Sequence, residues 1–266
     1  MSSETAPAAV TPLPLTQERC ASLRWRIPID QRHIARQPSV LLSVAELASI
    51  ALELPWFFVE RNGNWHAVAL MRNGVGGSCP WLQANGQSGL RVLPFLLRKY
   101  PFTLLPDGPR YRLGIWQDPT CIGASGAPLF ENGELAENVN LVVRAFSQFL
   151  NGVKVAHTLA LALSDAGVLK PASLPWSAGP KLMQVNEDAL RELPGSHLES
   201  LNKQGALGAA HAQLLSCHHF RRLIQSDAAS PESSGVVAPE ENHAFFDALA
   251  DDLQAGAEFY PGALSQ

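Results

Sequence analysis

The sequence predicts an α+β protein in which a hairpin-rich, mainly antiparallel sheet is covered by helices, and three observations lead to this fold class. Apolar runs within 56–71 flank Asn62-Gly63, a dipeptide that supplies the positive φ angles of a tight hairpin turn. Residues 102–116 repeat this arrangement around Asp107-Gly108. From Asn138 onward, apolar residues keep a helical period over about 25 residues, which predicts a long covering helix.

Length and composition indicate an ordinary globular chain. Its 266 residues are enough for one large domain or two small ones, and 46% of them are hydrophobic. The net charge of -4 and the 17% of charged residues predict no broad basic surface, so nucleic acid is not an expected partner. The charge-poor segments 40–58 and 155–163 are interrupted or too short to cross about 30 Å of hydrocarbon, so no membrane span is expected.

The N-terminal residues and the cysteines favour a cytoplasmic protein. Residues 1–18 are rich in Ser, Ala, Pro and Thr, and we expect a disordered tail because few large apolar groups are present. Glu4 stands where a secretory signal carries positive charge, so a surface location would need a route other than Sec export. Cys20, Cys79, Cys121 and Cys217 are widely separated and form no Cys-x-x-Cys pair, which predicts reduced thiols.

The first elements are a strand and a helix. In segment 23–27, apolar residues alternate with arginines and Pro28 follows, which predicts a half-buried strand at the edge of a sheet. Ser43-Val-Ala-Glu46 matches the capping box, in which the Ser hydroxyl and the Glu carboxylate satisfy free amides at a helix start. We expect this helix to cover 43–54, because Pro55 is a natural stop.

The middle of the chain holds a glycine-rich loop and a short helix. Residues 73–89 contain five glycines, but neither glycine spacing of the nucleotide-binding loops is present, so a flexible loop is expected. The stretch 89–116 then begins with leucines at helical spacing, which predict a short helix that Pro101 ends before the second hairpin.

The second half is mainly helical. The helix from Asn138 is expected to stop near Gly167, and the prolines of 171–180 mark a weak boundary inside a domain that spans 19–225. A strand at 181–185 and a helix at 186–193 follow. Small residues open a further helix at 205–225 and predict close packing, so that Gly208→Leu would destabilise the fold by about 1–3 kcal/mol through overpacking.

Beyond this domain, the sequence predicts a polar linker and a separate C-terminal element. Residues 226–239 are rich in Ser, Ala and Pro. Residues 240–253 place Phe245, Phe246 and Leu249 at helical spacing, which predicts an amphipathic helix within a C-terminal segment of 240–266.

Reactive side chains are densest around His211, Cys217 and His218, and they form no recognised catalytic or metal motif. Histidines seven residues apart on a helix are separated by about 10 Å along its axis, whereas zinc-binding helices use a four-residue spacing. Gly123-Ala-Ser125-Gly126 is one residue short of the hydrolase nucleophile elbow. We therefore predict no catalytic residue, no metal and no cofactor, and keep an enzyme using the histidine cluster as an alternative.

Aromatic and cationic side chains predict a partner-binding site. Trp81 lies in the glycine-rich loop, where an exposed aromatic side chain would suit a binding hot spot. Arg91, Tyr100 and Trp116 belong to the neighbouring stretch 89–116. We take these four residues as the candidate site for a peptide or protein partner.

Four segments together resemble the bacterial SapC family over about residues 12–225. They are Leu23-Arg-Trp-Arg26, Pro94-Phe-Leu-Leu-Arg-Lys-Tyr-Pro-Phe102, Gly126-Ala-Pro-Leu-Phe130 and Gly205-Ala-Leu-Gly-Ala-Ala-His-Ala-Gln-Leu-Leu-Ser216. The resemblance implies a surface-layer (S-layer) association, or a role as an accessory of TonB-dependent uptake or of a flavin-dependent halogenase-like protein. It brings no catalytic residues with it.

The sequence thus predicts a cytoplasmic, non-catalytic accessory protein that holds a peptide or protein partner. An S-layer-associated protein and an enzyme of unrecognised type using His211, Cys217 and His218 are the alternatives, and a homo-oligomer stays open.

Overall fold

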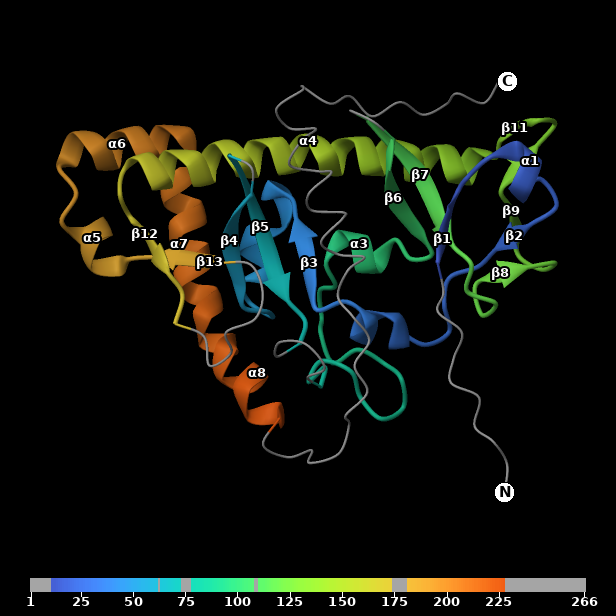
Figure 1. Ribbon diagram of the computed structural model, residues 1–266, viewed down its shortest axis with the longest axis horizontal. Coiled ribbons are helices and arrows are strands. Elements are labelled where there is room, and N and C mark those ends of the chain that lie inside the picture. The colour runs from blue at the N-terminus through green and yellow to red at the C-terminus, as the bar shows by residue number, and fades with distance from the viewer. Residues whose placement is uncertain (1–10, 62, 73–77, 108–109, 174–180, 228–266) are drawn as a thin grey trace.

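The computed structural model describes residues 11–61, 63–72, 78–107, 110–173 and 181–227, and it confirms the predicted α+β class (Figure 1). The predicted helix at 240–253 and most of the predicted linker lie outside the described residues. A single hydrophobic core runs through the described part, from Leu15 to Leu223.

The largest sheet has five strands in the order β12-β13-β4-β5-β3, and every pairing in it is antiparallel. The strands are β3 (Ser39–Leu42), β4 (Trp56–Arg61), β5 (Asn64–Leu70), β12 (Leu169–Pro171) and β13 (Leu182–Val185). The predicted first hairpin is confirmed as β4 and β5, with Trp56 opposite Ala69 and Gly63 at a φ of 78°. The connection across 171–180 links β12 to β13, which pair with each other.

The remaining strands form three smaller antiparallel groups. One sheet has the order β1-β7-β6, a second has the order β8-β2-β9, and a hairpin joins β10 to β11. Their bounds are β1 (Pro12–Pro14), β2 (Arg24–Trp25), β6 (Phe102–Asp107), β7 (Arg110–Trp116), β8 (Ile122–Gly123), β9 (Ala127–Pro128), β10 (Phe130–Glu131) and β11 (Glu134–Leu135). The predicted second hairpin is confirmed as β6 and β7.

Two expectations about the N-terminal part differ from the structure. Within the predicted tail 1–18, residues 12–14 form β1, because their backbone pairs with β7 and the adjacent Leu15 is buried in the core. The strand predicted at a sheet edge, β2, instead lies between β8 and β9. Its two neighbours come from 122–128, where two strands of only two residues each are too short to give a recognisable strand pattern in the sequence.

The helices pack on the sheets as predicted, with α4 running across the whole described part (Figure 1). Helix α4 packs on β5, and α7 packs on α2, α4, β4 and β13. The helical segments are α1 (Gln17–Cys20), η1 (Arg32–Arg36), η2 (Val44–Glu46), α2 (Leu47–Ile50), α3 (Phe95–Arg98), α4 (Glu137–Asp165), α5 (Glu187–Arg191), α6 (Gly195–Gln204), α7 (Ala206–Ser216), η3 (Cys217–His219) and α8 (Phe220–Asp227).

Several predicted helices have different bounds. The expected helix at 43–54 is shorter and is split into η2 and α2. Helix α3 begins only after Pro94, because proline disfavours helical conformation in the residue before it. The helix at 205–225 contains the 3-10 turn η3. Helix α6 was not predicted; it begins directly after Pro194, and proline is common at the start of a helix.

Two buried polar side chains hold these elements together. Glu46 accepts a hydrogen bond from the backbone amide of Ser43 (3.2 Å), as the capping box predicts, and another from the amide of Phe95 (2.5 Å). Gln213 of α7 is fully buried; it accepts from the Val185 amide (2.9 Å) and donates to the Trp56 carbonyl (3.1 Å). Each therefore fixes one segment on another that is distant in sequence.

The prediction of tight packing at Gly208 was wrong. A Cβ atom at this position would meet no atom within 4 Å, because Gly208 lies on the exposed side of α7. We now expect Gly208→Ala to raise the free energy of unfolding by about 0.5–1 kcal/mol, since glycine costs a helix interior conformational entropy. Urea denaturation followed by circular dichroism measures this change, and a destabilised variant would show that the helix face is covered.

Candidate partner-binding surface

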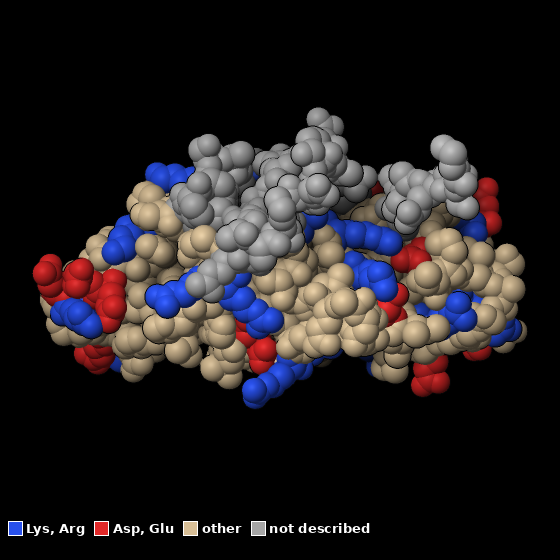
Figure 2. All heavy atoms as spheres, turned by 90° about the horizontal axis from the view of Figure 1, so that it is seen from below, with Lys and Arg blue, Asp and Glu red and all other residues tan. Residues whose placement is uncertain are grey.

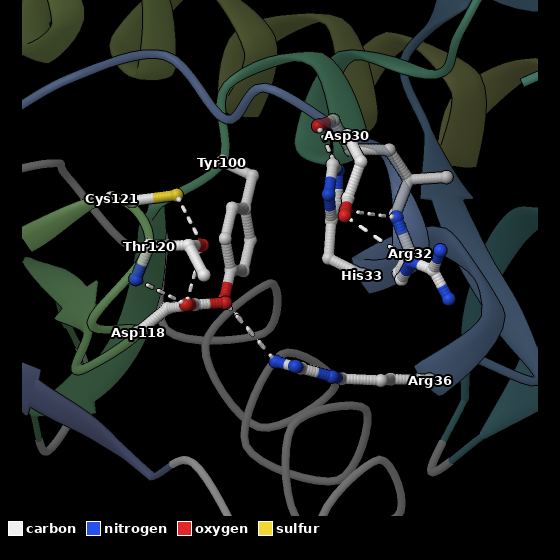
Figure 3. A network of polar contacts seen from close by, with 9 residues as sticks. Asp30, Arg32, His33, Arg36, Tyr100, Asp118, Thr120 and Cys121 are labelled. Atoms are coloured by element: carbon white, nitrogen blue, oxygen red, sulfur yellow. Dashed lines mark hydrogen bonds and ion pairs between the residues drawn. The ribbon is translucent and has the colours of Figure 1, made fainter. Parts of the chain in front are cut away.

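A network of polar side chains joins three parts of the chain beside β7 (Figure 3). Asp118 follows β7 and is 6% exposed. Its Oδ2 accepts a hydrogen bond from the Tyr100 hydroxyl (2.7 Å) and lies 3.5 Å from Nη1 of Arg36, at the end of η1. Its Oδ1 accepts from both the hydroxyl (2.6 Å) and the amide (2.9 Å) of Thr120. Both carboxylate oxygens are therefore occupied.

Aromatic stacking fixes the position of Tyr100 in this network. The His33 ring lies against the Tyr100 ring with centroids 4.3 Å apart and an angle of 11° between the planes. His33 is itself held by a hydrogen bond from Nε2 to the Leu97 carbonyl (3.0 Å). On the β7 side, the Trp116 ring is stacked at a centroid distance of 6.5 Å. The structure thus brings together Tyr100 and Trp116, two of the four predicted site residues.

The electrostatics of the network suit a fixed ion pair and do not suit proton transfer at neutral pH. Burial acts to raise the pKa of Asp118, but the hydrogen bonds from Thr120 and Tyr100 and the charge of Arg36 outweigh it, so the pKa is lowered. Burial and the hydrogen bond to Asp118 raise the pKa of Tyr100 far above its ordinary value. Asp118 is therefore a carboxylate, and Tyr100 is a neutral hydrogen-bond donor.

An exposed surface lies next to this network, and we call it the arginine–isoleucine surface. It consists of Arg24, Arg26, Ile27, Ile29, Arg32 and Arg36. Ile27 and Ile29 are 76% and 80% exposed, more than any other large apolar side chain that the structure describes. The four arginines around them are exposed as well. Figure 2, which views the molecule from below relative to Figure 1, shows exposed Lys and Arg side chains in several groups on that face.

Hydrogen bonds hold this surface in place from both sides. Arg26 donates from its amide to the Cys121 carbonyl (2.9 Å) and from Nε to the Thr120 carbonyl (2.8 Å). On the other side, Gln87 Nε2 donates to the carbonyl of Ile29 (3.0 Å). Because backbone and side-chain bonds fix the segment, the exposed isoleucines are presented by an ordered backbone.

The other two predicted site residues lie elsewhere. Trp81 is 1% exposed, so the expectation of an exposed aromatic side chain was wrong. The Arg222 guanidinium covers its ring at 4.8 Å and also bonds the Pro80 carbonyl, which closes the loop over the tryptophan. The side chain of Arg91 is 92% exposed and lies 3.9 Å from Glu53.

The histidine and cysteine cluster forms no metal site in the part of the chain that the structure describes. No group of three or more His, Cys, Asp or Glu side chains there is arranged to hold a metal ion. His211 and His218 are exposed. Cys217 lies 3.3 Å from the side-chain amide of Gln213, and burial raises the pKa of its thiol, so it is not an activated thiolate.

Sequence reasoning missed the residues that build the surface. The alternation of 23–27 was interpreted as a strand with Ile27 facing the core, whereas β2 ends at Trp25. Ile27-Pro28-Ile29 was a usable signal, since proline between two isoleucines argues against a continuing strand. The Arg36–Asp118 pair carried no signal because its members are 82 positions apart.

One of three comparisons with known proteins finds a match. The family model described as SapC matches residues 15–223. The comparison with curated proteins finds no match, and neither does the comparison with solved structures. Within the described residues, no helix combines the length and apolar character that crossing a membrane requires. The family match covers well over half of the sequence, including α4 and every strand of the described part except β1, and the chain therefore belongs to the SapC family.

Proposed function

We propose that this chain is a non-catalytic binding protein that holds a peptide or protein partner on the arginine–isoleucine surface. The observation that carries the proposal is the exposure of Ile27 and Ile29 on a segment fixed by hydrogen bonds. Exposed apolar side chains grouped with polar ones are typical of protein interaction sites, whereas isolated ones need no explanation. Arginine at the rim of such a patch is enriched at binding surfaces.

The chemistry of the surface indicates a partner segment that combines apolar and acidic side chains. Apolar groups of the partner would cover Ile27 and Ile29, while carboxylates would face the arginines. Arg32 is paired with Asp30 (3.2 Å) and Arg36 with Asp118 (3.5 Å). Arg24 donates to the Gly126 carbonyl and Arg26 to the Thr120 carbonyl, and carbonyl oxygens leave these two positive charges unneutralised. Arginine also suits bidentate recognition of carboxylates.

A panel of synthetic peptides tests the proposal. Peptides that alternate apolar residues with acidic, neutral or basic ones are titrated into the full chain and followed by fluorescence anisotropy. We expect the acidic series to bind, and the double variant Ile27→Ser/Ile29→Ser to weaken that binding about tenfold or more. The affinity should also fall as salt is added.

The matched control is Leu141→Ser/Leu161→Ser, which removes two exposed leucines from α4 (59% and 40% exposed). This variant should bind as the wild type does. Equal losses in both double variants, or binding that prefers the basic series, would contradict the assignment of the surface.

The family resemblance supports a narrower proposal, in which the partner belongs to TonB-dependent uptake or is a flavin-dependent halogenase-like protein in the cytoplasm. An S-layer association rests on the resemblance alone. An enzyme using His211, Cys217 and His218 stays the other alternative, and these residues form no metal site within the described residues. Co-purification with the candidate partners and cell fractionation separate these possibilities.

A further inference from the structure

The charges of this chain are divided unequally along its length. All 20 Lys and Arg residues lie at or before Arg222, whereas the C-terminal residues 228–266 contain seven acidic side chains. These are Glu232, Glu240, Glu241, Asp247, Asp251, Asp252 and Glu258. With the other 17 acidic residues, 1–227 carries a formal charge of +3, and 228–266 carries -7. The two parts are therefore expected to attract each other.

The acidic segment also has the apolar side chains that the arginine–isoleucine surface would need. Phe245, Phe246, Leu249 and Leu253 recur at helical spacing among Asp247, Asp251 and Asp252. In a helix they would form an apolar stripe flanked by carboxylates. This is the combination of apolar and acidic groups that the surface is suited to bind, with its two isoleucines and with Arg24 and Arg26, which bond only backbone carbonyls among the contacts described above.

The point at which the described chain ends favours this contact. Arg222 of α8 donates to the Pro80 carbonyl (3.2 Å), at the start of the loop 80–89. The same loop reaches the surface, because Gly86 accepts from the Gln31 amide (2.7 Å) and Gln87 bonds the Ile29 carbonyl. The connection 228–239 can extend to about 40 Å at 3.3–3.6 Å per residue. We therefore expect it to be long enough to pass the loop 80–89 and bring residues 240–253 to the surface.

We propose that residues 240–253 dock on the arginine–isoleucine surface of their own chain and compete there with an external partner. The proposal rests on the proposed function for its site and adds the regulation of that site. A docked segment lowers the apparent affinity for the partner, because the intrinsic affinity is multiplied by the fraction of molecules in which the surface is free.

The test uses the full chain with its carboxylates neutralised by Asp247→Asn, Asp251→Asn and Asp252→Asn. The readout is the isoleucine methyl NMR spectrum, with Ile27 and Ile29 assigned by substitution to valine. We expect both signals to shift in the neutralised variant, while buried Ile50 and Ile115 stay unchanged. A synthetic 240–253 peptide added to the neutralised variant should reverse the shift, and the acidic test peptides should bind it several-fold more tightly than they bind the wild type.

The control variant removes three exposed carboxylates at the end of the molecule opposite β2, by Glu187→Gln, Glu192→Gln and Glu199→Gln (Figure 1). It should leave the Ile27 and Ile29 signals in place. Unchanged Ile27 and Ile29 signals in the neutralised variant would overturn the proposal. Shifts that depend on protein concentration would overturn it as well, because they indicate that a second copy of the chain occupies the surface.

The two proposals fail in different ways. If the substitutions in 240–253 leave the NMR signals of Ile27 and Ile29 unchanged but the acidic peptides bind, self-docking is wrong and the binding function stands. If the substitutions in 240–253 shift both signals but no peptide of the panel binds even the neutralised variant, self-docking stands and the binding of an external partner is wrong.

Discussion

Trp81→Ala is expected to lower the free energy of unfolding by about 3–5 kcal/mol, the usual cost of truncating a buried tryptophan. Trp81 is 1% exposed, and its side chain is among the largest that are fully buried in the described part. Removing it leaves a cavity beneath the loop 78–89 and also removes the ring that Arg222 covers at 4.8 Å. Chemical denaturation followed by fluorescence of the other tryptophans measures the change.

The control for this prediction is Arg222→Ala, which keeps the tryptophan and removes the cation above it together with the hydrogen bond to the Pro80 carbonyl. We expect this substitution to cost about 0.5–1 kcal/mol, because Arg222 is exposed and a cation–π contact in water is weak. A Trp81→Ala protein that is as stable as the wild type would contradict the assignment of Trp81 to the core.

Asp118→Ala is the second substitution with a large expected effect, about 2–4 kcal/mol of lost unfolding free energy. It leaves the buried hydroxyl of Tyr100 without its acceptor, and an unsatisfied buried donor costs about 1–3 kcal/mol. It also removes the acceptor of the Thr120 amide, although Thr120 is exposed and water can replace part of that bond. Arg36 contributes less to this loss, because its side chain is 47% exposed and water can solvate it.

The pH dependence of stability provides a control for this prediction. The pKa of Asp118 is lower in the folded chain than in the unfolded chain, so its contribution is complete above the unfolded pKa and is lost as the pH falls through the folded value. We expect Asp118→Asn to be less sensitive to acid below about pH 4 than the wild type. Equal acid sensitivity would show that other carboxylates account for the loss of stability.

The sequence predicted the elements whose signals are local. Asn62-Gly63 marks a hairpin because only a few residue types accept positive φ angles, and Gly63 has a φ of 78°. The apolar stripe of α4 is periodic over the whole helix, and its predicted stop at Gly167 coincides with a φ of 70°. The predicted fold class followed from these features.

Long-range pairing explains what the sequence did not predict. Strand β2 has only two residues, and it is held between β8 and β9, which lie about a hundred positions away along the chain. The same folding places Asp118 against Tyr100 and Arg36 and exposes Ile27, none of which has a local signature. Tyr100 and Trp116 were chosen as aromatic residues of one stretch, and the β6–β7 hairpin brings them together.

The most direct test of the binding surface is to map where a bound peptide lies. An acidic, apolar peptide carrying a photoreactive benzophenone is bound to the full chain, crosslinked by light and located by mass spectrometry. The binding account predicts crosslinks within 24–36, and their loss in Ile27→Ser/Ile29→Ser. Crosslinks that fall instead on the outer face of α4, or beside Arg91 and Glu53, would contradict it.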